Sequence, residues 1–235
     1  MKKCQSRLEK SIQNLENGNN LKELENKELQ LDYEEKTTNI LDNKLIMDSL
    51  DYYKFANDDE KKEQMINISK IFLTDRHIGQ INNLVIYENL EELYLQRNYI
   101  NIIENLEFSN KIVILSLNFN YIKKIEGLKS LKCLKILDLS ENLIDSFDLK
   151  EIPQNVEFLY LYENPFFEHI DLLNYRYDCI NYFDHLVILD SLEISDREKL
   201  LFYGRKSYEK HKLIFTKKLQ FIKFHYEYFL FFNLE

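Results

Sequence analysis

The sequence predicts an α/β solenoid, and one repeated motif carries most of that prediction. The motif LxxLxLxxNxI recurs with a fixed period of 22 residues, and its copies start at Ile68, Leu90, Ile112, Leu134 and Val156. Its inner leucines alternate with other residues, as in a short strand with one buried face. This period and pattern indicate a leucine-rich repeat. We therefore expect a right-handed leucine-rich repeat solenoid, with a parallel β-sheet on its concave face and helical caps at both ends.

The strand of each repeat should fall at the same point of the motif. The spacing predicts parallel strands near residues 71–73, 93–95, 115–117, 137–139 and 159–161. Neighbouring strands should pair in sequence order, because each repeat buries its apolar side only against the next repeat. Return segments such as 100–106 and 122–128 supply further inward-pointing apolar residues on the convex side.

A column of asparagines follows the predicted strands, namely Asn98, Asn120, Asn142 and Asn164. The chain must turn sharply after each strand, and the turning backbone groups need hydrogen-bond partners. An amide side chain can donate and accept at once, so we expect a buried asparagine ladder. Arg76 stands at this position in the first repeat and has no acceptor atom, which predicts an incomplete ladder at that end.

The remaining sequence suggests caps and appendages around the repeats. We predict a flexible charged arm over 1–38, N-terminal capping helices over 39–66, five repeats over 67–166, a C-terminal cap over 167–195 and a C-terminal helix and tail over 196–235. Pro165 should end the regular pattern, because proline lacks an N–H group. Ser195 and Glu198 have the spacing of a capping box, which predicts a helix that begins there.

The tail is basic and then strongly aromatic. From Asp196 onward, nine Lys and Arg stand against five Asp and Glu. Its far end carries Leu213, Phe215, Leu219, Ile222, Phe224, Phe229 and Phe232, which should not stay free in water. Charged residues between them argue against a transmembrane span. Three outcomes stay open: the tail folds back on the solenoid, docks on a neighbour in an assembly, or is unstructured.

Composition and charge exclude several classes of protein. A net charge of −9 and a pI near 5.2 argue against general binding to nucleic-acid backbones, which needs clustered Lys and Arg. Cys4, Cys133 and Cys179 form no CxxC pair, so neither a disulfide framework nor a zinc site is expected. No apolar stretch follows Met1, so a secretory signal is not expected either, and a cytoplasmic location fits best.

No enzyme chemistry is evident in the sequence. It contains no phosphate-binding loop, dinucleotide fingerprint, zinc-protease motif or nucleophile elbow, so we expect no catalysis, no cofactor, no metal and no small-molecule substrate. His185 lies near Cys179, Asp184 and Asp190 in the predicted cap, where packing accounts for these residues better than a catalytic pair does. Cys133 is predicted to be a small core residue in a convex return segment.

The outward-facing strand positions predict a binding surface for a protein. The candidate partner-binding residues are Phe72, Tyr94, Ile114, Phe119, Ile136, Phe158, Tyr160 and Tyr162. Side chains on a concave sheet face should contact water, and a large apolar patch there usually marks a protein partner. Two alternative origins of this patch stay open. One of the protein's own terminal segments could cover it, or an A/T-rich coding bias could have enriched aromatic residues there.

The repeat unit LxxLxLxxNxIxxIxxL resembles the short, SDS22-like class of leucine-rich repeats, and the segment from Asn164 to Asp190 is similar to the cap of that class. Members include axonemal dynein light chain 1, the U2 snRNP A-prime protein and regulators of protein phosphatase 1. The segments 93–100, 137–144 and 152–156 are similar to the leucine-rich repeat-containing protein 46 family, which is associated with cilia and sperm flagella.

This resemblance implies a protein-binding adaptor that holds a helix or loop of a larger assembly, in the cytoplasm and in a cilium or flagellum. It also implies two alternatives. One is a splicing scaffold in the nucleus, and the other is a regulatory subunit of protein phosphatase 1, although that group generally has more repeats.

Overall fold

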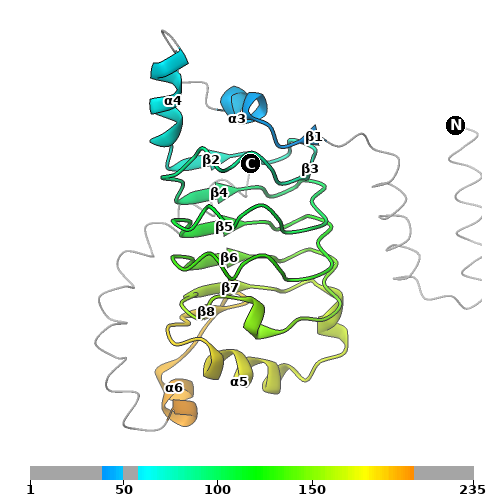
Figure 1. Cartoon of the computed structure of the whole chain (residues 1–235). Coiled ribbons are helices and arrows are strands. Elements are labelled where there is room, and N and C mark those ends of the chain that lie inside the picture. The colour runs from blue at the N-terminus through cyan, green and yellow to red at the C-terminus, as the bar shows by residue number, and fades with distance from the viewer. Residues whose placement is uncertain (1–38, 50–57, 204–235) are drawn as a thin grey trace, which may run out of the picture. The chain divides into compact units, whose positions relative to one another are not determined.

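The computed structural model describes residues 39–49 and 58–203 (Figure 1). The predicted arm over 1–38 and the tail beyond residue 203 lie outside the described residues. The main element is a seven-stranded sheet in the order β2-β4-β5-β6-β7-β8-β9. Its first five strands are β2 (Lys70–Phe72), β4 (Glu92–Tyr94), β5 (Ile114–Ser116), β6 (Ile136–Asp138) and β7 (Phe158–Tyr160). The predicted solenoid of parallel strands is confirmed.

Strand pairing follows the repeat without a slip. Every pair from β2 to β7 is parallel and joins residues 22 positions apart, as Leu93 and Leu115 show. Each strand begins one residue before its predicted range, because the outward-facing residue ahead of the first inward leucine also joins the ladder. β8 (Ile188–Leu189) continues the sheet in parallel, and β9 (Leu192–Glu193) closes it as an antiparallel hairpin.

The inward-facing residues form one continuous core along the repeats. The side chains of Ile71, Leu93, Leu115, Leu137 and Leu159 are all 0% exposed. Burying one such side chain contributes roughly 1.5–3 kcal/mol to folding. Because each repeat contacts mainly its neighbours, this contribution is shared along the solenoid and is not concentrated in one centre.

The predicted asparagines lie buried at the turn after each strand. The Oδ1 atom of Asn120 accepts a hydrogen bond from the N–H of Ile100 at 3.0 Å. Its Nδ2 atom donates to the carbonyls of Leu95 and Leu117, both at 3.0 Å. Asn98, Asn142 and Asn164 make the equivalent bonds in their own repeats. Each side chain therefore joins the turns of two successive repeats.

The first repeat has no such side chain. The exposed Arg76 joins the ladder only through its backbone N–H, which donates to the Oδ1 atom of Asn98 at 3.0 Å, while its carbonyl accepts from the side-chain amide of Asn39 at 2.9 Å. The ladder therefore begins one repeat late. The same turn holds a non-glycine residue in the left-handed region in every repeat, with φ between 54° and 58° at Asp75, Arg97, Phe119, Glu141 and Glu163. A left-handed backbone costs a residue with a Cβ atom roughly 1–2 kcal/mol.

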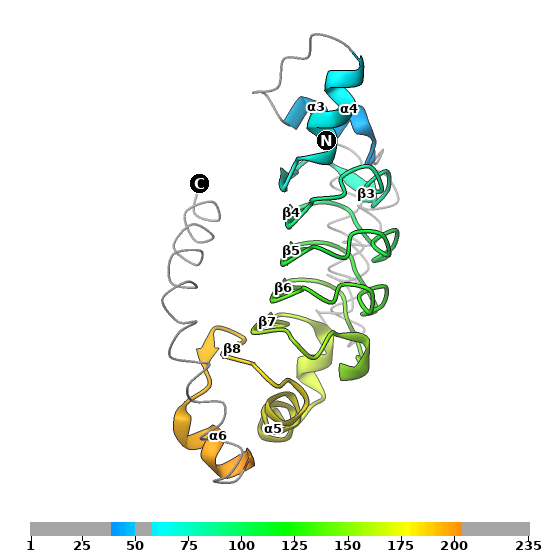
Figure 2. The same cartoon turned by 60° about the vertical axis from the view of Figure 1, so that its left-hand side comes forward.

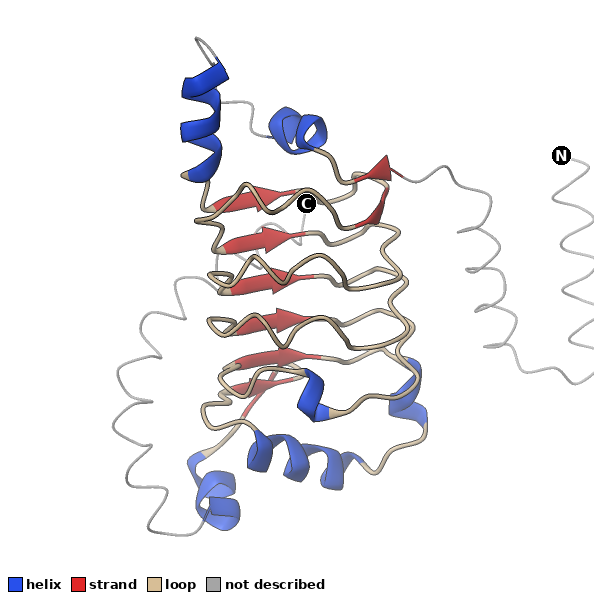
Figure 3. Cartoon of the chain, in the orientation of Figure 1, coloured by secondary structure: helices blue, strands red, loops and turns tan. Residues whose placement is uncertain are grey.

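Helices lie at both ends of the repeats (Figure 3). At the N-terminal end are α3 (Asn43–Ser49) and α4 (Asp58–Ile66), and Ile46 and Met65 from them are buried in the core. β1 (Asn39–Ile40) pairs in parallel with β3 (Ile78–Gln80), which the sequence did not predict. Strand β1 has only two residues and therefore no readable alternation.

A short 3₁₀ helix, η1 (Leu149–Glu151), lies in the return segment between β6 and β7. The 3₁₀ helix η2 (Pro165–Glu168) and the helices α5 (Leu172–Tyr182) and α6 (Asp196–Tyr203) follow the last repeat strand, β7. The carboxylate of Asp190 fastens α5 to the last repeat. It accepts from the N–H of Leu161 at 2.6 Å and from the hydroxyl of Tyr175 at 2.7 Å. Phe166 of η2 and Cys179 of α5 are buried in the core.

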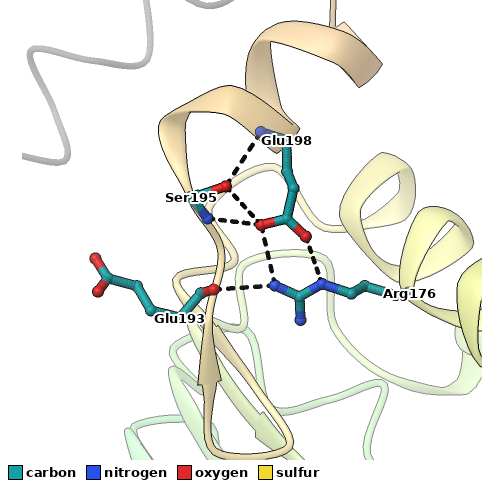
Figure 4. Close-up of polar contacts among 4 residues, drawn as sticks. All are labelled: Arg176, Glu193, Ser195 and Glu198. Atoms are coloured by element: carbon teal, nitrogen blue, oxygen red, sulfur yellow. Dashed lines mark hydrogen bonds and ion pairs between the residues drawn. The ribbon is translucent and has the colours of Figure 1, made fainter.

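The start of α6 is held by the predicted capping box (Figure 4). The N–H of Glu198 donates to the Ser195 hydroxyl at 3.3 Å, and the Glu198 carboxylate accepts from the N–H of Ser195 at 2.9 Å. Arg176 of α5 donates to the same carboxylate at 2.6 Å and to the carbonyl of Glu193 at 2.9 Å. The bond from Arg176 to this carboxylate, together with those from Ser195, lowers the pKa of Glu198 to about 2.

The position of Cys133 differs from the prediction. It is exposed, whereas Cys179 is fully buried. Cys133 precedes the buried Leu134 and lies in the turn ahead of β6, where only the flanking leucines point inward. Burial raises the pKa of the Cys179 thiol, and the nearby Asp190 carboxylate raises it further. Cys179 is therefore a packing residue, as the sequence predicted for this part of the cap.

Candidate functional site

The outward-facing side chains of the sheet form the candidate site, here called the strand face. It consists of three columns that run across the strands: Lys70, Glu92, Ile114, Ile136, Phe158 and Ile188; Phe72, Tyr94, Ser116, Asp138 and Tyr160; and Thr74, Gln96, Asn118, Ser140 and Tyr162. Figure 2 shows the strands stacked along one side of the solenoid. Because the inward residues already fill the core, the strand face is free to vary without loss of the fold.

The N-terminal part of the strand face is an aromatic pair beside an ion pair. The rings of Phe72 and Tyr94 stack with centroids 4.7 Å apart and planes 6° apart. Lys70 lies 2.8 Å from the Glu92 carboxylate, which also accepts a 3.0 Å hydrogen bond from the Tyr94 hydroxyl. Burial and this carboxylate raise the pKa of Tyr94, so its hydroxyl stays protonated. The N-terminal part of the strand face therefore presents hydrogen-bond donors and acceptors in a fixed arrangement beside the apolar surface of two aromatic rings.

The middle of the strand face is polar. The Ser116 hydroxyl donates to the Asn118 side-chain oxygen at 2.9 Å, and the Asp138 carboxylate accepts from the N–H and the hydroxyl of Ser140 at 3.0 and 2.6 Å. Burial raises the pKa of Asp138 to about 6, and the negative charges of Asp190 and Glu141 raise it as well. A cation or a hydrogen-bond donor placed beside Asp138 would stabilise its carboxylate.

The C-terminal part of the strand face is apolar. Phe158, Tyr160 and Val187 form a buried cluster, and Ile136, Tyr162 and Ile188 pack against it. The sequence predicted four of these residues as partner-binding and missed Val187 and Ile188. The insertion that carries α5 breaks the 22-residue register before them. Only alignment of Leu186 and Leu189 with the leucines of a full repeat would have placed Ile188 beside Phe158.

The predicted set does not form one continuous patch. Phe72 pairs with Tyr94 at one end, and the cluster around Tyr160 lies at the other, with the polar group around Asp138 between them. Phe119 stands apart in the turn, where the Arg97 guanidinium lies 5.3 Å from its ring centroid. The asparagine ladder lies behind the face, inside the turns, and contributes no side chain to it.

Several predicted face residues are also less accessible than expected. Phe72 is 40% exposed and Phe119 is 43% exposed, but Ile114, Phe158 and Tyr160 are 3%, 2% and 4% exposed. Packing against Val187 and Ile188 of the cap accounts for Phe158 and Tyr160. The expectation that the whole face is open to water was therefore wrong for the C-terminal half.

The cap residues that suggested a Cys/His pair serve packing. Asp190 accepts hydrogen bonds from Leu161 and Tyr175, and Cys179 is buried among apolar residues. Within residues 39–49 and 58–203, no group of His, Cys, Asp and Glu has an arrangement that could hold a metal ion. No helix in this part of the chain is long and apolar enough to cross a membrane.

Comparison with known proteins supports the fold. No family model and no curated protein matches this sequence. A chain of the crystal structure of the Drosophila melanogaster SNF/U2A′ complex superposes with a TM-score of 0.55 at 23% identity, and the match covers 74% of this chain and 97% of that chain. An internalin (InlF) from Listeria monocytogenes gives a TM-score of 0.43 at 21% identity over 55% of this chain and 42% of that chain. Together with the strand pairing, the first likeness shows that this chain has the leucine-rich repeat fold.

Proposed function

We propose that this protein is a non-enzymatic adaptor that binds a helix or loop of a protein partner against its strand face. The observation that carries the proposal is the apolar cluster of Ile136, Phe158, Tyr160 and Tyr162, which gathers on a sheet face that the solenoid core does not use. Phe158 and Tyr160 also pack against Val187 of the cap, whereas Ile136 and Tyr162 at the edge of the cluster are half-buried and offer an apolar surface to a partner. Aromatic anchors in a desolvated pocket typically supply most of the energy of a protein interface.

The polar middle of the face adds specificity to this proposal. The side-chain oxygen of Gln96 is buried and has no hydrogen-bond partner among the described residues. The Asp138 carboxylate lies two strands away, and both groups accept hydrogen bonds. A partner that presents a Lys, an Arg or another donor would pair with Gln96 and add to the bonds that Asp138 already accepts from Ser140. A wholly apolar partner would leave the Gln96 oxygen unpaired at a cost of about 1–3 kcal/mol.

Two settings are proposed for this binding. The sequence resemblance favours an axonemal assembly of a cilium or flagellum, and there the partner is a cytoskeletal component. A splicing scaffold is the second candidate, because the SNF/U2A′ complex structure contains a chain that this fold covers over 97% of its length. In that setting the partner is an RNA-binding protein, and this chain itself contacts no nucleic acid.

The proposal is tested by capture of partners from a lysate with matched variants of the full chain. Ile136→Asp changes a half-buried residue on the strand face, and Ile102→Asp makes the same change at a residue that is 47% exposed in a return segment. Loss of a central anchor should weaken binding by about 2 kcal/mol or more, a factor of roughly 30. We expect Ile136→Asp to lose the wild-type partner and Ile102→Asp to retain it.

Tyr160→Asp provides a second substitution on the face, and the melting temperature of every variant shows whether it is folded. Retention of every wild-type partner by folded Ile136→Asp and Tyr160→Asp chains would contradict the proposal. Mass spectrometry of the captured protein separates the two settings, since a cytoskeletal partner supports the axonemal one and an RNA-binding partner supports the splicing one.

A further inference from the structure

The burial of the strand face changes along the solenoid. In the first repeat, Phe72 is 40% exposed, as expected for a large side chain on an open sheet. In the following repeats most of the face is closed: Gln96, Ile114, Ser116, Asn118, Asp138 and Ser140 are each 4% exposed or less, and Tyr94, Ile136 and Tyr162 are half-buried. The concave face of a repeat solenoid normally forms an extended surface that is open to partners.

The described elements do not account for this closure in the middle repeats. Within residues 39–49 and 58–203, the helices α3 and α4 lie at one end of the sheet and α5 and α6 at the other (Figures 1 and 2). Strand β5 is flanked by β4 and β6, which lie in the plane of the sheet and cannot cover its face. The apolar cluster around Val187 reaches Ile136 but does not include Ile114. A further segment must therefore lie over this face.

The chemistry of the closed face specifies the segment that fits it. Gln96 offers a buried oxygen with no described partner, and Glu92 and Asp138 add carboxylates. Glu141 and Glu163 follow at the edge of the face, and burial and the charge of Glu163 raise the pKa of Glu141. A segment that carries basic groups among aromatic side chains would pair with these acceptors and with the apolar end.

Of the three stretches outside the described residues, 1–38, 50–57 and 204–235, only the last is both basic and aromatic, since 50–57 carries one Lys against one Asp. Residues 204–235 carry seven Lys and Arg against three Asp and Glu, together with nine Tyr and Phe, whereas the whole chain has a net charge of −9. Residues 1–38 carry seven Lys and Arg against eight Asp and Glu and only one aromatic residue, so their chemistry does not match. Opposite charge on two surfaces favours their contact.

The length of this segment is sufficient. The helix α6 follows β9 at the C-terminal end of the sheet (Figure 2), and its last residue is Tyr203. Thirty-two residues follow, and they would span about 48 Å if helical. The distance from β8 back to β4 is four strand spacings, or about 19 Å. The segment can therefore reach every closed repeat.

We propose that residues 204–235 bind the strand face of the same chain over the middle and C-terminal repeats. The segment acts as an internal occupant, with its basic residues beside Glu141 and Glu163 at the edge of the face and its aromatic residues over Ile114 and Ile136. If the face also binds a protein partner, as proposed above, that partner must displace the segment or bind beside it at the open first repeat. The internal contact itself does not depend on any partner.

Zero-length carbodiimide cross-linking of the purified full chain tests this contact. The reagent joins lysines directly to carboxylates. Glu141 and Glu163 lie at the edge of the strand face, and Glu104 and Glu126 lie in return segments with comparable exposure, so they are matched controls. At low micromolar concentration we expect links from Lys210, Lys212, Lys217, Lys218 or Lys223 to Glu141 or Glu163, within monomeric chains. Links of equal yield to Glu104 and Glu126, links only between two copies, or no links to the face would overturn the proposal.

A variant with two reversed charges in the segment provides a second test of the contact. Lys217→Glu with Lys218→Glu should lower the yield of links from the other tail lysines to Glu141 and Glu163 several-fold, because like charges then face each other. Unchanged yields would overturn the electrostatic basis of the contact. Since this experiment contains no partner, its failure is independent of the adaptor function, and loss of the adaptor function would leave the cross-links unchanged.

Discussion

The inside of each turn and the strand face of the same repeat follow opposite rules. Four successive turns hold the same residue, from Asn98 to Asn164, in nearly the same set of hydrogen bonds. The face changes from Glu92 through Ile114 to Phe158 along a single column, while the backbone register stays constant. Repetition therefore marks the residues that stabilise the solenoid, and variation marks those available for recognition. Substitutions on the two sides should accordingly affect different measurements.

Replacement of a ladder residue should have the largest effect on stability. In Asn120→Leu, the N–H of Ile100 loses its buried partner, and the carbonyls of Leu95 and Leu117 each lose one of the two ladder bonds that they accept, keeping those from Asn98 and Asn142. The unpaired N–H costs about 1–3 kcal/mol and each further lost bond about 1 kcal/mol, so we expect a loss of about 3 kcal/mol or more. Denaturant unfolding measures it. The control Asn110→Leu, at an exposed position, should change stability little. Equal stability of the two variants would contradict the claim that the asparagine ladder stabilises the solenoid.

A smaller loss is expected at Gly127, in a return segment. Its φ is +72°, and an added Cβ atom would lie 2.5 Å from the carbonyl oxygen of Ile103. That backbone cannot yield as a flexible side chain could, so Gly127→Ala should cost about 2–3 kcal/mol from strain and steric overlap. The exposed neighbour Glu126→Ala provides the baseline in the same thermal melts. If Gly127→Ala binds a partner less well after correction for unfolding, the return segments would belong to the recognition surface.

Substitution of Asp138 should raise the stability of the chain, whereas the two substitutions above lower it, because Asp138 lies on the strand face. Its folded pKa is raised from 3.8 to about 6, so it favours the folded state below pH 3.8 and this contribution is lost as pH rises through 6. At pH 7.5 the buried charge is therefore unfavourable. Asp138→Asn can still accept from Ser140 and should raise stability by on the order of 1–2 kcal/mol at pH 7.5 but hardly at all at pH 4. A stability difference that is the same at both pH values would show that Asp138 is not buried as described.

The smallest effect is expected in the left-handed turns. Glu141 has φ of 54° and is repelled by Glu163. Asparagine tolerates this backbone better than glutamate does, and the substitution also removes a charge. Glu141→Asn should therefore stabilise the chain by roughly 0.5–1 kcal/mol. Glu126→Asn, at a residue without positive φ, should bring no such gain in the same urea titration. A destabilised Glu141→Asn chain would show that the Glu141 side chain makes a contact of its own.

The parts that a sequence can predict are those that repeat. Five copies of the motif placed the strands to within one residue and located the asparagine column, because the same physical demand recurs in every turn. The strand face was harder, since its side chains obey no period. Ile114 and Asp138 lie in equivalent strands, yet their exposure depends on what lies over the sheet. Val187, Ile188 and the β1–β3 pair were missed because insertions or short length remove the period that identifies a strand.

We expect the strand face, and not the rest of the surface, to receive the partner. A photo-activated cross-linking phenylalanine placed at Phe72 or at Phe108 tests this most directly. Both residues are exposed, by 40% and 68%, but Phe72 lies on the open part of the face and Phe108 lies between a return segment and the next strand. After irradiation with the partner, we predict a covalent complex from position 72 and none from position 108. A complex formed at position 108, with none at position 72, would contradict the assignment of the strand face as the binding surface.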